Sequence, residues 1–90
     1  MTRVIQTTAQ FKRDYKRQVK RGKDMTVIKR VVIRLVQGES LELNYRDHPL
    51  MGGYQGSHEC HLEPDWLLIY ELTHEELILI RTGSHSDLFA

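Results

Sequence analysis

The sequence predicts a small α+β domain in which a two-helix hairpin covers one face of an antiparallel sheet. Two segments in the first half repeat apolar residues at helical spacing, while three later segments are short, apolar and bounded by turn residues. Neither layer can bury its apolar side alone, so the helices and the sheet must pack together. The length of 90 residues suits one domain, 1–90, with the expected order β-α-α-β-β-β.

The first strand and the first helix are expected in the N-terminal third. A β-branched pair at positions 4 and 5 predicts a short strand over Arg3–Gln6. Thr7 is expected to cap the following helix, with Gln10 closing a capping box three residues later. The helix should run to about Arg21, and its narrow apolar stripe consists of Phe11, Tyr15 and Val19.

A second helix is expected directly after a tight turn. Gly22 is typical of the position that ends a helix, and Asp24 can cap the next one. This second helix should span about Met25–Gln37 and be the more buried of the two, because its apolar face is broader. That face consists of Met25, Ile28, Val31, Val32, Leu35 and Val36.

The second half of the chain predicts an antiparallel meander after a loop at 41–53. The expected strands are Tyr54–Leu62, Trp66–Leu72 and Leu77–Arg81. Residues 66–70 are apolar on both faces, which indicates a central strand. The segment 82–84 should break the last strand, and the residues after His85 should form a tail.

Charge is distributed unevenly between the two parts of the chain. Residues 1–34 hold eleven of the thirteen Lys and Arg but only two of the twelve Asp and Glu. A basic block of this size is a plausible surface for nucleic-acid phosphates, although an ordinary solvated helix face is the simpler interpretation. Within it we single out Lys16, Lys20 and Arg21 as candidate contacts to RNA.

The composition also indicates the cellular compartment of the protein. The single cysteine, Cys60, cannot form an internal disulfide, which is typical of a reducing compartment. The N-terminus lacks the apolar core of a signal peptide, and no apolar run is long enough to span a membrane. We therefore expect a cytoplasmic protein without a membrane partner.

Functional groups concentrate in the stretch from His61 to Trp66, which holds an imidazole, two carboxylates and the chain's only tryptophan. His48 precedes this stretch in a loop, and Arg81 and His85 follow it at the end of the last strand. Antiparallel pairing can bring His85 beside the 61–65 region, but the strand register cannot be read from the sequence.

Histidines in such a cluster suit acid–base chemistry, because imidazole titrates near neutrality. Cleavage of RNA by its own 2′-hydroxyl needs a base, a cation to stabilise the phosphate and an acid for the leaving oxygen, without metal or cofactor. Five residues supply these groups: His48, His61, Asp65, Arg81 and His85. An RNA base could stack on Trp66 or Phe89.

Structural interpretations compete with each of these assignments. Trp66 begins an apolar strand and is more simply a core residue, and Phe89 could merely pack the tail. Arg81 could form a salt bridge with Glu59 or Glu63. A zinc site is conceivable, but its ligands match no usual spacing; they would be His48, His58, Cys60 and His61.

Three motifs in this order resemble the YafQ branch of the RelE/ParE toxin superfamily, and the similarity extends over essentially the whole chain. The motifs are Asp47-His48-Pro49-Leu50, His61-x-Glu63-Pro64-Asp65-Trp66 and Arg81-Thr82-Gly83-Ser84-His85, with Leu88-Phe89 following. The resemblance implies a microbial-RNase-like α+β fold and a type II toxin that cleaves mRNA in the ribosomal A site. The residues that match the family's site are His48, His61, Asp65, Trp66, His85 and Phe89.

The resemblance also implies partners. They are the ribosome with its mRNA and a cognate antitoxin, usually of ribbon-helix-helix type, and the toxin–antitoxin complex commonly binds operator DNA. Within this scheme we expect His85 to act as the general acid and Arg81 to stabilise the transition state. We expect His48 or His61 to act as the general base, with Asp65 adjusting the basicity of that histidine. The alternatives are a ParE-like inhibitor of DNA gyrase without nuclease activity and a non-catalytic nucleic-acid-binding module.

Overall fold

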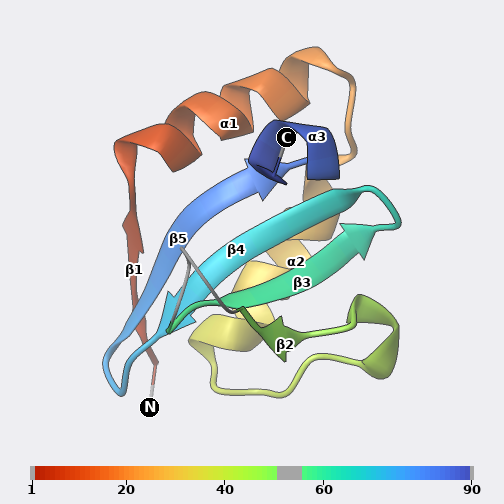
Figure 1. Cartoon of the computed structure of the whole chain (residues 1–90). Helices are drawn as coiled ribbons and strands as arrows, with labels where there is room; N and C mark the ends of the chain where they lie inside the picture. Colours follow the sequence, from red (N-terminus) through yellow and green to blue (C-terminus); the bar gives the residue numbers. More distant parts are fainter. Residues whose placement is uncertain (1, 51–55, 90) are drawn as a thin grey trace.

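The computed structural model describes residues 2–50 and 56–89, which form a five-stranded sheet with helices on both sides (Figure 1). The strand order is β1-β5-β4-β3-β2. The elements are β1 (Val4–Thr7), α1 (Ala9–Lys20), α2 (Met25–Val36), the short 3₁₀ helix η1 (Leu43–Tyr45), β2 (His48–Pro49), β3 (His58–Glu63), β4 (Trp66–Leu72), β5 (Glu76–Gly83) and α3 (His85–Phe89). The α+β class is confirmed.

The sheet is mixed, so the prediction of an antiparallel sheet was wrong for its first strand. β1 pairs with β5 in parallel, with Val4 opposite Glu76 and Thr7 opposite Leu79, while the other pairs are antiparallel. The reason is topological: α1 and α2 together form a long connection, which lets the chain return to the sheet in either direction. β2 was not predicted, because two residues are too short to give a periodic signal.

Both long helices form where the sequence predicts them, with one change at the first cap. Thr8, not Thr7, caps α1, and its hydroxyl accepts a hydrogen bond from the Phe11 N–H at 2.9 Å. Thr7 instead ends β1. Asp24 caps α2 as predicted, accepting from the Thr26 N–H at 3.0 Å.

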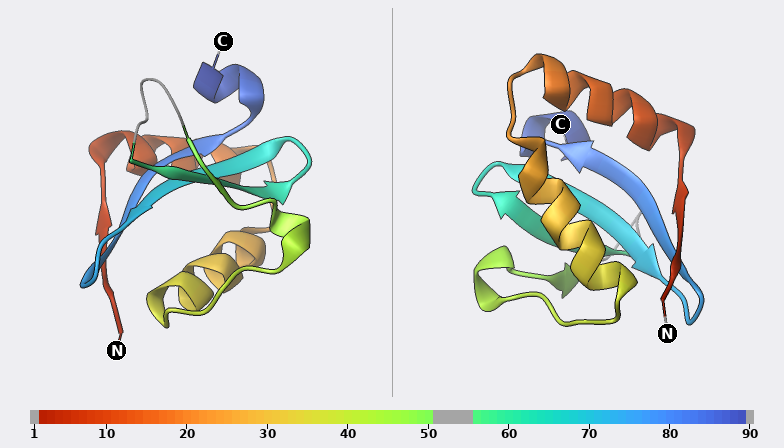
Figure 2. Two further views of the ribbon diagram at one scale, coloured as in Figure 1. Left: turned by 60° about the horizontal axis from the view of Figure 1, so that its bottom comes forward. Right: turned by 180° about the vertical axis from the view of Figure 1, so that it is seen from behind.

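The sheet separates two cores. On one side α2 lies across the strands (Figure 2), and Ile28, Val31 and Leu35 pack against side chains of β3, β4 and β5. On the other side the short helix α3 follows the end of β5 (Figure 1), and its Leu88 packs against Leu67 and Ile69 of β4. β4 is therefore buried on both faces, as its apolar run predicts.

β5 and the chain after it differ most from the sequence prediction. The strand continues through Thr82 to Gly83 instead of breaking at 82–84, and α3 replaces the expected tail. The register shifts once: Tyr70 pairs with Leu79 but Ile69 pairs with Arg81, which makes Ile80 the extra residue of a β-bulge. At the predicted strand Tyr54–Leu62, residues 54–55 lie outside the described part, and β3 itself begins at His58.

Within residues 2–50 and 56–89, none of the helices combines the length and the apolar content that crossing a bilayer requires.

Candidate active site

Three histidines from three elements form a row on one side of the molecule. The ring centroids of His48 (β2) and His61 (β3) are 6.4 Å apart, and those of His61 and His85 (α3) are 5.8 Å apart. The Glu59 carboxylate lies between the first two: its Oε1 is 3.6 Å from His48 Nε2 and 3.3 Å from His61 Nε2. Three of the predicted site residues therefore converge, as expected from the sequence.

The strand register explains why His85 reaches this row. His61 is opposite Leu67 on β4, and Leu67 is opposite Gly83 on β5. The chain turns after Gly83 into α3, so His85 comes back over the row that contains His61. β2 adds His48 from the other side, because His48 is paired with Glu59.

Asp65 orients His85 and not the other two histidines. One carboxylate oxygen of Asp65 accepts from the His85 backbone N–H at 2.9 Å and lies 2.7 Å from His85 Nδ1. These two hydrogen bonds hold the pKa of Asp65 below its ordinary value, so the carboxylate stays ionised. The expectation that Asp65 tunes His48 or His61 was wrong, and Glu59 occupies that place.

Hydrogen-bond chemistry assigns the tautomer of His85 and limits that of His48. A carboxylate can only accept, so His85 Nδ1 carries a proton and His85 Nε2 is left to exchange one. His48 Nδ1 lies 3.2 Å from the carbonyl oxygen of Pro49, which also only accepts. A proton on His48 Nδ1 would be satisfied by this oxygen, while His48 Nε2 faces the Glu59 carboxylate at 3.6 Å, and the ring is half exposed.

The same cluster can also hold a metal ion. In the described part of the chain, one group of donor atoms lies close enough for this purpose: those of His48, Glu59 and His61, all within 4.8 Å of one another. The zinc site considered from the sequence does not form. Cys60 points into the core on the opposite face from His61, and burial raises the pKa of its thiol, which disfavours the thiolate that metals bind.

Arg81 is engaged with a buried carboxylate that the sequence did not reveal. Its Nε and one terminal nitrogen donate to Asp14 of α1 at 2.9 and 3.1 Å, and the Thr82 N–H donates to the same group at 3.3 Å. Burial alone would raise the pKa of Asp14, but the hydrogen bonds from Arg81, Gln10 and Thr82 lower it. The suggested salt bridges from Arg81 to Glu59 or Glu63 are replaced by this pair.

The two aromatic candidates have different environments. Trp66 is completely buried, and its indole N–H donates to the Thr82 hydroxyl at 2.9 Å, so it is a core residue and its ring is not available to stack on a base. Phe89 is half exposed, and its ring lies 6.5 Å from that of His85. Of the two, only Phe89 is placed to contact a substrate bound at the histidine row.

The three basic candidates on α1 also differ. Lys16 and Lys20 are exposed on the surface of the helix. Arg21, in contrast, makes two hydrogen bonds to the Asp87 carboxylate of α3, at 2.6 and 3.0 Å. Much of its charge is thus neutralised within the protein, which weakens the case for Arg21 as a contact to RNA.

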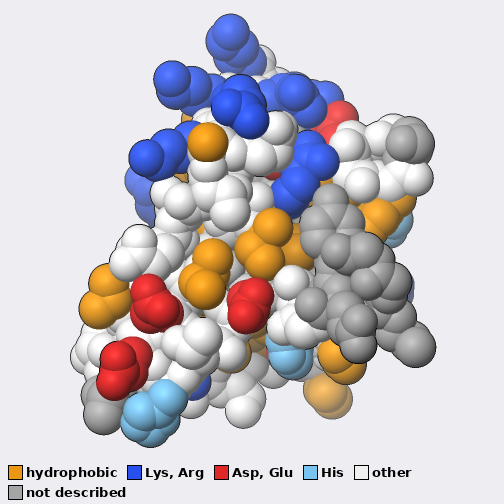
Figure 3. All heavy atoms as spheres, turned by 60° about the vertical axis from the view of Figure 1, so that its left-hand side comes forward, with side chains coloured by type: hydrophobic (Ala, Val, Ile, Leu, Met, Phe, Trp, Pro, Cys, Tyr) orange, Lys and Arg blue, Asp and Glu red, His pale blue; other side chains and the backbone are white. Residues whose placement is uncertain are grey.

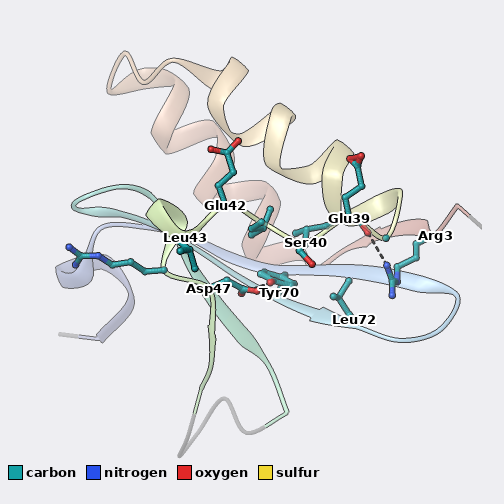
Figure 4. A pocket seen from close by; sticks show the side chains of 12 residues that line it. Arg3, Glu39, Ser40, Glu42, Leu43, Asp47, Tyr70 and Leu72 are labelled. Carbon is teal, nitrogen blue, oxygen red and sulfur yellow. Dashed lines mark hydrogen bonds between the residues drawn. The ribbon is translucent and has the colours of Figure 1, made fainter.

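One hollow lies apart from the histidine row. A pocket of about 370 Å³ opens between the end of α2, the 38–43 segment and β4 (Figure 4). Its wall includes Asp47, whose carboxylate accepts a hydrogen bond from the Tyr70 hydroxyl. We do not assign the chemistry to this pocket, because none of the described histidines lines it. Its importance for the site is that Tyr70 anchors the residue before His48.

Two residues of the site were missed from the sequence. Glu59 had a usable signal, since it shares a strand face with His61 two residues later. Asp14 had none: an acid in a lysine-rich helix is expected to be exposed, and only the packing of α1 against β5 buries it.

Comparison with known proteins identifies the class to which this fold and site belong. Residues 3–90 match the family described as "Bacterial toxin of type II toxin-antitoxin system, YafQ". The chain is 42% identical over 88 residues to the mRNA interferase toxin YafQ of Escherichia coli K12, covering 97% of this chain and 96% of that protein. The chain belongs to the YafQ family of type II toxins.

Solved structures support the same assignment. The toxin in the E. coli DinJ-YafQ toxin–antitoxin complex is 41% identical to this chain, with a TM-score of 0.93 and complete coverage of both chains. A metal-bound toxin from Helicobacter pylori is 43% identical, with a TM-score of 0.90 over 99% of this chain and 100% of that one. The predicted fold family is therefore confirmed.

Proposed function

We propose that this toxin is a ribosome-dependent endoribonuclease that cleaves mRNA in the A site and so stops translation. The observation that carries the proposal is the row of three imidazoles with two carboxylates: Glu59 between His48 and His61, and Asp65 on His85 at the end of the row. Such a row supplies a proton acceptor and a proton donor to one phosphodiester. The mRNA interferase name of the E. coli relative agrees with this chemistry.

In the proposed reaction, neutral His48 accepts the proton of the ribose 2′-hydroxyl through its Nε2. The hydroxyl oxygen attacks the adjacent phosphorus, the bond to the 5′-oxygen breaks, and His85 Nε2 donates a proton to that oxygen. Ionised Asp65 stabilises the protonated form of His85 before the transfer. The products are a 2′,3′-cyclic phosphate and a 5′-hydroxyl, and the reaction needs no metal.

The remaining candidates support substrate binding. Two hydrogen bonds to Asp14 orient the Arg81 guanidinium and balance part of its charge, as Asp87 does for Arg21. We retain Arg81 as the candidate cation for the phosphate because it lies at the end of β5, two residues before Gly83. Phe89 contacts a base near His85. Lys16 and Lys20 are exposed, and we assign them to contacts with ribosomal RNA. The proposed substrate implies that the protein acts in the cytoplasm.

The deciding experiment is cleavage of ribosome-bound mRNA by purified protein, followed by analysis of the new RNA ends. Wild type should give 2′,3′-cyclic or 3′-phosphate ends, and His85→Ala should lose the activity. His74→Ala is the matched control, because His74 is an exposed histidine in the turn between β4 and β5, away from the row. It should cleave like wild type.

The same experiment separates the alternatives. If the wild type does not cut but blocks DNA gyrase, the nuclease proposal fails and the ParE-like activity replaces it. A non-catalytic RNA-binding module predicts that neither histidine change matters, while changes of Lys16 and Lys20 weaken binding.

We also propose that this chain binds a cognate antitoxin, as the E. coli relative in the DinJ-YafQ complex does. A hollow of about 300 Å³ with almost entirely apolar walls opens between β1, α1 and α2. Figure 3 shows this face, on which hydrophobic side chains lie below a band of lysines and arginines. The residues lining the hollow are Ile5, Phe11, Tyr15, Ile28, Lys29, Val32, Ile33 and Leu79.

The chemistry of this surface defines the segment that fits it. Beside the hollow, β1 is an edge strand with all four residues exposed, so another strand can pair with it. The cations at its border favour an acidic segment with apolar side chains. We assign the hollow to such a segment of the antitoxin, of ribbon-helix-helix type, in a complex that binds operator DNA. Ile33→Asp should abolish co-purification with the antitoxin, and Thr26→Asp, exposed elsewhere on α2, should not.

A metal ion is proposed here as an inhibitor. One H. pylori relative is a metal-bound toxin, and His48, Glu59 and His61 can hold an ion in this chain. An ion at these atoms would occupy the imidazole lone pair that the proposed base needs. Metal binding and RNA cleavage should therefore exclude each other.

A further inference from the structure

α3 carries His85, yet its own interactions are too few to hold it. The helix has five residues, and an isolated helix of this length is not stable in water. The hydrogen bond between His85 and Asp65 joins side chains that are 52% and 69% exposed, so water competes for it. Leu88 is the one buried residue of the helix. Something further must fix the position of α3.

A reciprocal pair of hydrogen bonds begins the helix. The Ser84 hydroxyl accepts from the Asp87 N–H at 3.1 Å, and an Asp87 carboxylate oxygen accepts from the Ser84 N–H at 2.9 Å. This is a capping box, which satisfies two backbone donors at the helix start. It makes Asp87 part of the turn that precedes His85.

The same carboxylate connects α3 to the end of α1. Arg21, the residue that ends α1, donates to both Asp87 oxygens at 2.6 and 3.0 Å, and an Arg17 nitrogen lies 3.8 Å away. Planar two-point pairs of this kind fix orientation as well as distance. The Arg21 hydrogen bond, together with those of Ser84, holds the pKa of Asp87 far below its ordinary value despite partial burial.

Gly83 provides the space that this arrangement needs. A Cβ on Gly83 would lie 2.8 Å from an Asp87 carboxylate oxygen and 2.9 Å from Asp87 Cβ. Gly83 is not among the glycines with positive φ, so its backbone would accept an alanine. The glycine is therefore required by the close approach of Asp87 and by no special backbone conformation.

We propose that Arg21 is a positioning residue for the reaction, which acts through Asp87 to hold α3 where His85 meets Asp65 beside His61. Arg21 touches neither substrate nor reacting atoms in this role. The proposal rests on the ribonuclease function proposed above, because it assigns a task to the helix that carries the acid.

The test is a double-mutant cycle with Arg21→Gln and Asp87→Asn. Asparagine keeps the shape of Asp87 and can still accept from the Ser84 N–H, but it loses the ion pair. Each single variant should lower kcat roughly ten- to a hundredfold, the size expected when a catalytic group is misplaced by about 1 Å. The KM of Asp87→Asn should stay unchanged, and the double variant should be no slower than the slower single variant.

Two further variants complete the design. Gly83→Ala should lower kcat to a similar extent, because the new methyl group displaces the Asp87 carboxylate. Arg30→Gln is the matched control, since Arg30 is an exposed cation on α2, and it should keep the wild-type kcat. A structural signal independent of activity is the NMR shift of the His85 amide, which donates to Asp65; it should move in the variants of Arg21, Asp87 and Gly83 and not in Arg30→Gln.

The outcomes separate this positioning role from the proposed function. If the effects of the two single variants multiply in the double variant, or if Asp87→Asn keeps the wild-type kcat and His85 amide shift, Arg21 acts on RNA and the positioning role is refuted. If wild type does not cleave RNA, the ribonuclease function fails, and the NMR measurement still decides whether Arg21 and Asp87 position His85.

Discussion

Replacing Asp14 by asparagine should destabilise the protein strongly, although the side chain keeps its size. Asp14 is completely buried and accepts four hydrogen bonds, two from Arg81 and one each from Gln10 and the Thr82 N–H. The asparagine amide would place two hydrogen atoms where donors already point. The Arg81 guanidinium would then be partly buried without its counter-charge.

The magnitude follows from these interactions. Breaking a buried pair by removing one partner costs about 3–5 kcal/mol, and we take the lower end because Arg81 is 20% exposed. For a domain of this size each kcal/mol corresponds to roughly 4–8 °C in melting temperature. A destabilisation of about 3 kcal/mol therefore predicts a melting temperature lower by about 12 °C or more.

The assay is urea unfolding, followed by circular dichroism, of wild type, Asp14→Asn and Glu42→Gln. Glu42 is an exposed carboxylate, and its replacement removes the same charge without disturbing a buried partner, so this variant should unfold like wild type. Because the pKa of Asp14 is lowered in the folded state, its contribution is complete above about pH 4 and is lost as the pH falls further. The difference between wild type and Asp14→Asn should shrink over that range.

A destabilisation of less than about 1 kcal/mol would refute this reasoning, since that is the size typical of an exposed ion pair. Such a result would mean that the Asp14–Arg81 pair is open to water in solution. Arg81 would then be available to the substrate without a structural task, and its assignment would rest on the phosphate contact alone.

Three other predictions concern the site directly. Asp65→Asn should lower kcat about a hundredfold, because it removes the charge that stabilises protonated His85. The melting temperature should change little, since Asp65 is exposed. Single-turnover cleavage and thermal denaturation test this, and a large fall in melting temperature would contradict it. The double variant Lys16→Gln, Lys20→Gln should bind ribosomes with a weaker salt dependence. The slope of log affinity against log salt concentration should fall by about one for each phosphate that is no longer neutralised. An unchanged slope would show that these lysines are not in the interface. Zinc should inhibit cleavage, and a chelator selective for zinc over Mg²⁺ should leave it intact. Inactivation by that chelator would argue for a metal-dependent reaction.

Local signals in the sequence were sufficient for the long elements. Asp24 and Gly22 mark the turn between the helices, and the apolar run from Trp66 identifies the central strand. α3 also had a readable signal, since Ser84 and Asp87 have the spacing of a capping box. The short helix was missed because five residues give no hydrophobic period.

Long-range pairing could not be predicted in the same way. The direction of β1 relative to β5 depends on the whole path of the chain through α1, α2 and the strands β2 to β4. The partner of Asp65 depends on the register that aligns Gly83 with His61 through Leu67. Neither is encoded within a short window. The convergence of the three histidines was expected from their positions at the ends of elements. Which carboxylate lies beside which histidine depends on the strand register: Glu59 is beside His48 and His61, and Asp65 is beside His85.

The bulge at Ile80 limits where this family can gain or lose residues. Beyond it, successive positions of β5 have separate tasks: Arg81 meets Asp14, Thr82 meets Trp66, and Gly83 leaves room for Asp87. Deleting Ile80 would remove the bulge, so the residues after it would keep their partners on β4 but lose the local bend and twist that direct their side chains. Natural length variation should therefore avoid residues 80–83 and be tolerated in the exposed turn at 73–75, which carries none of these interactions.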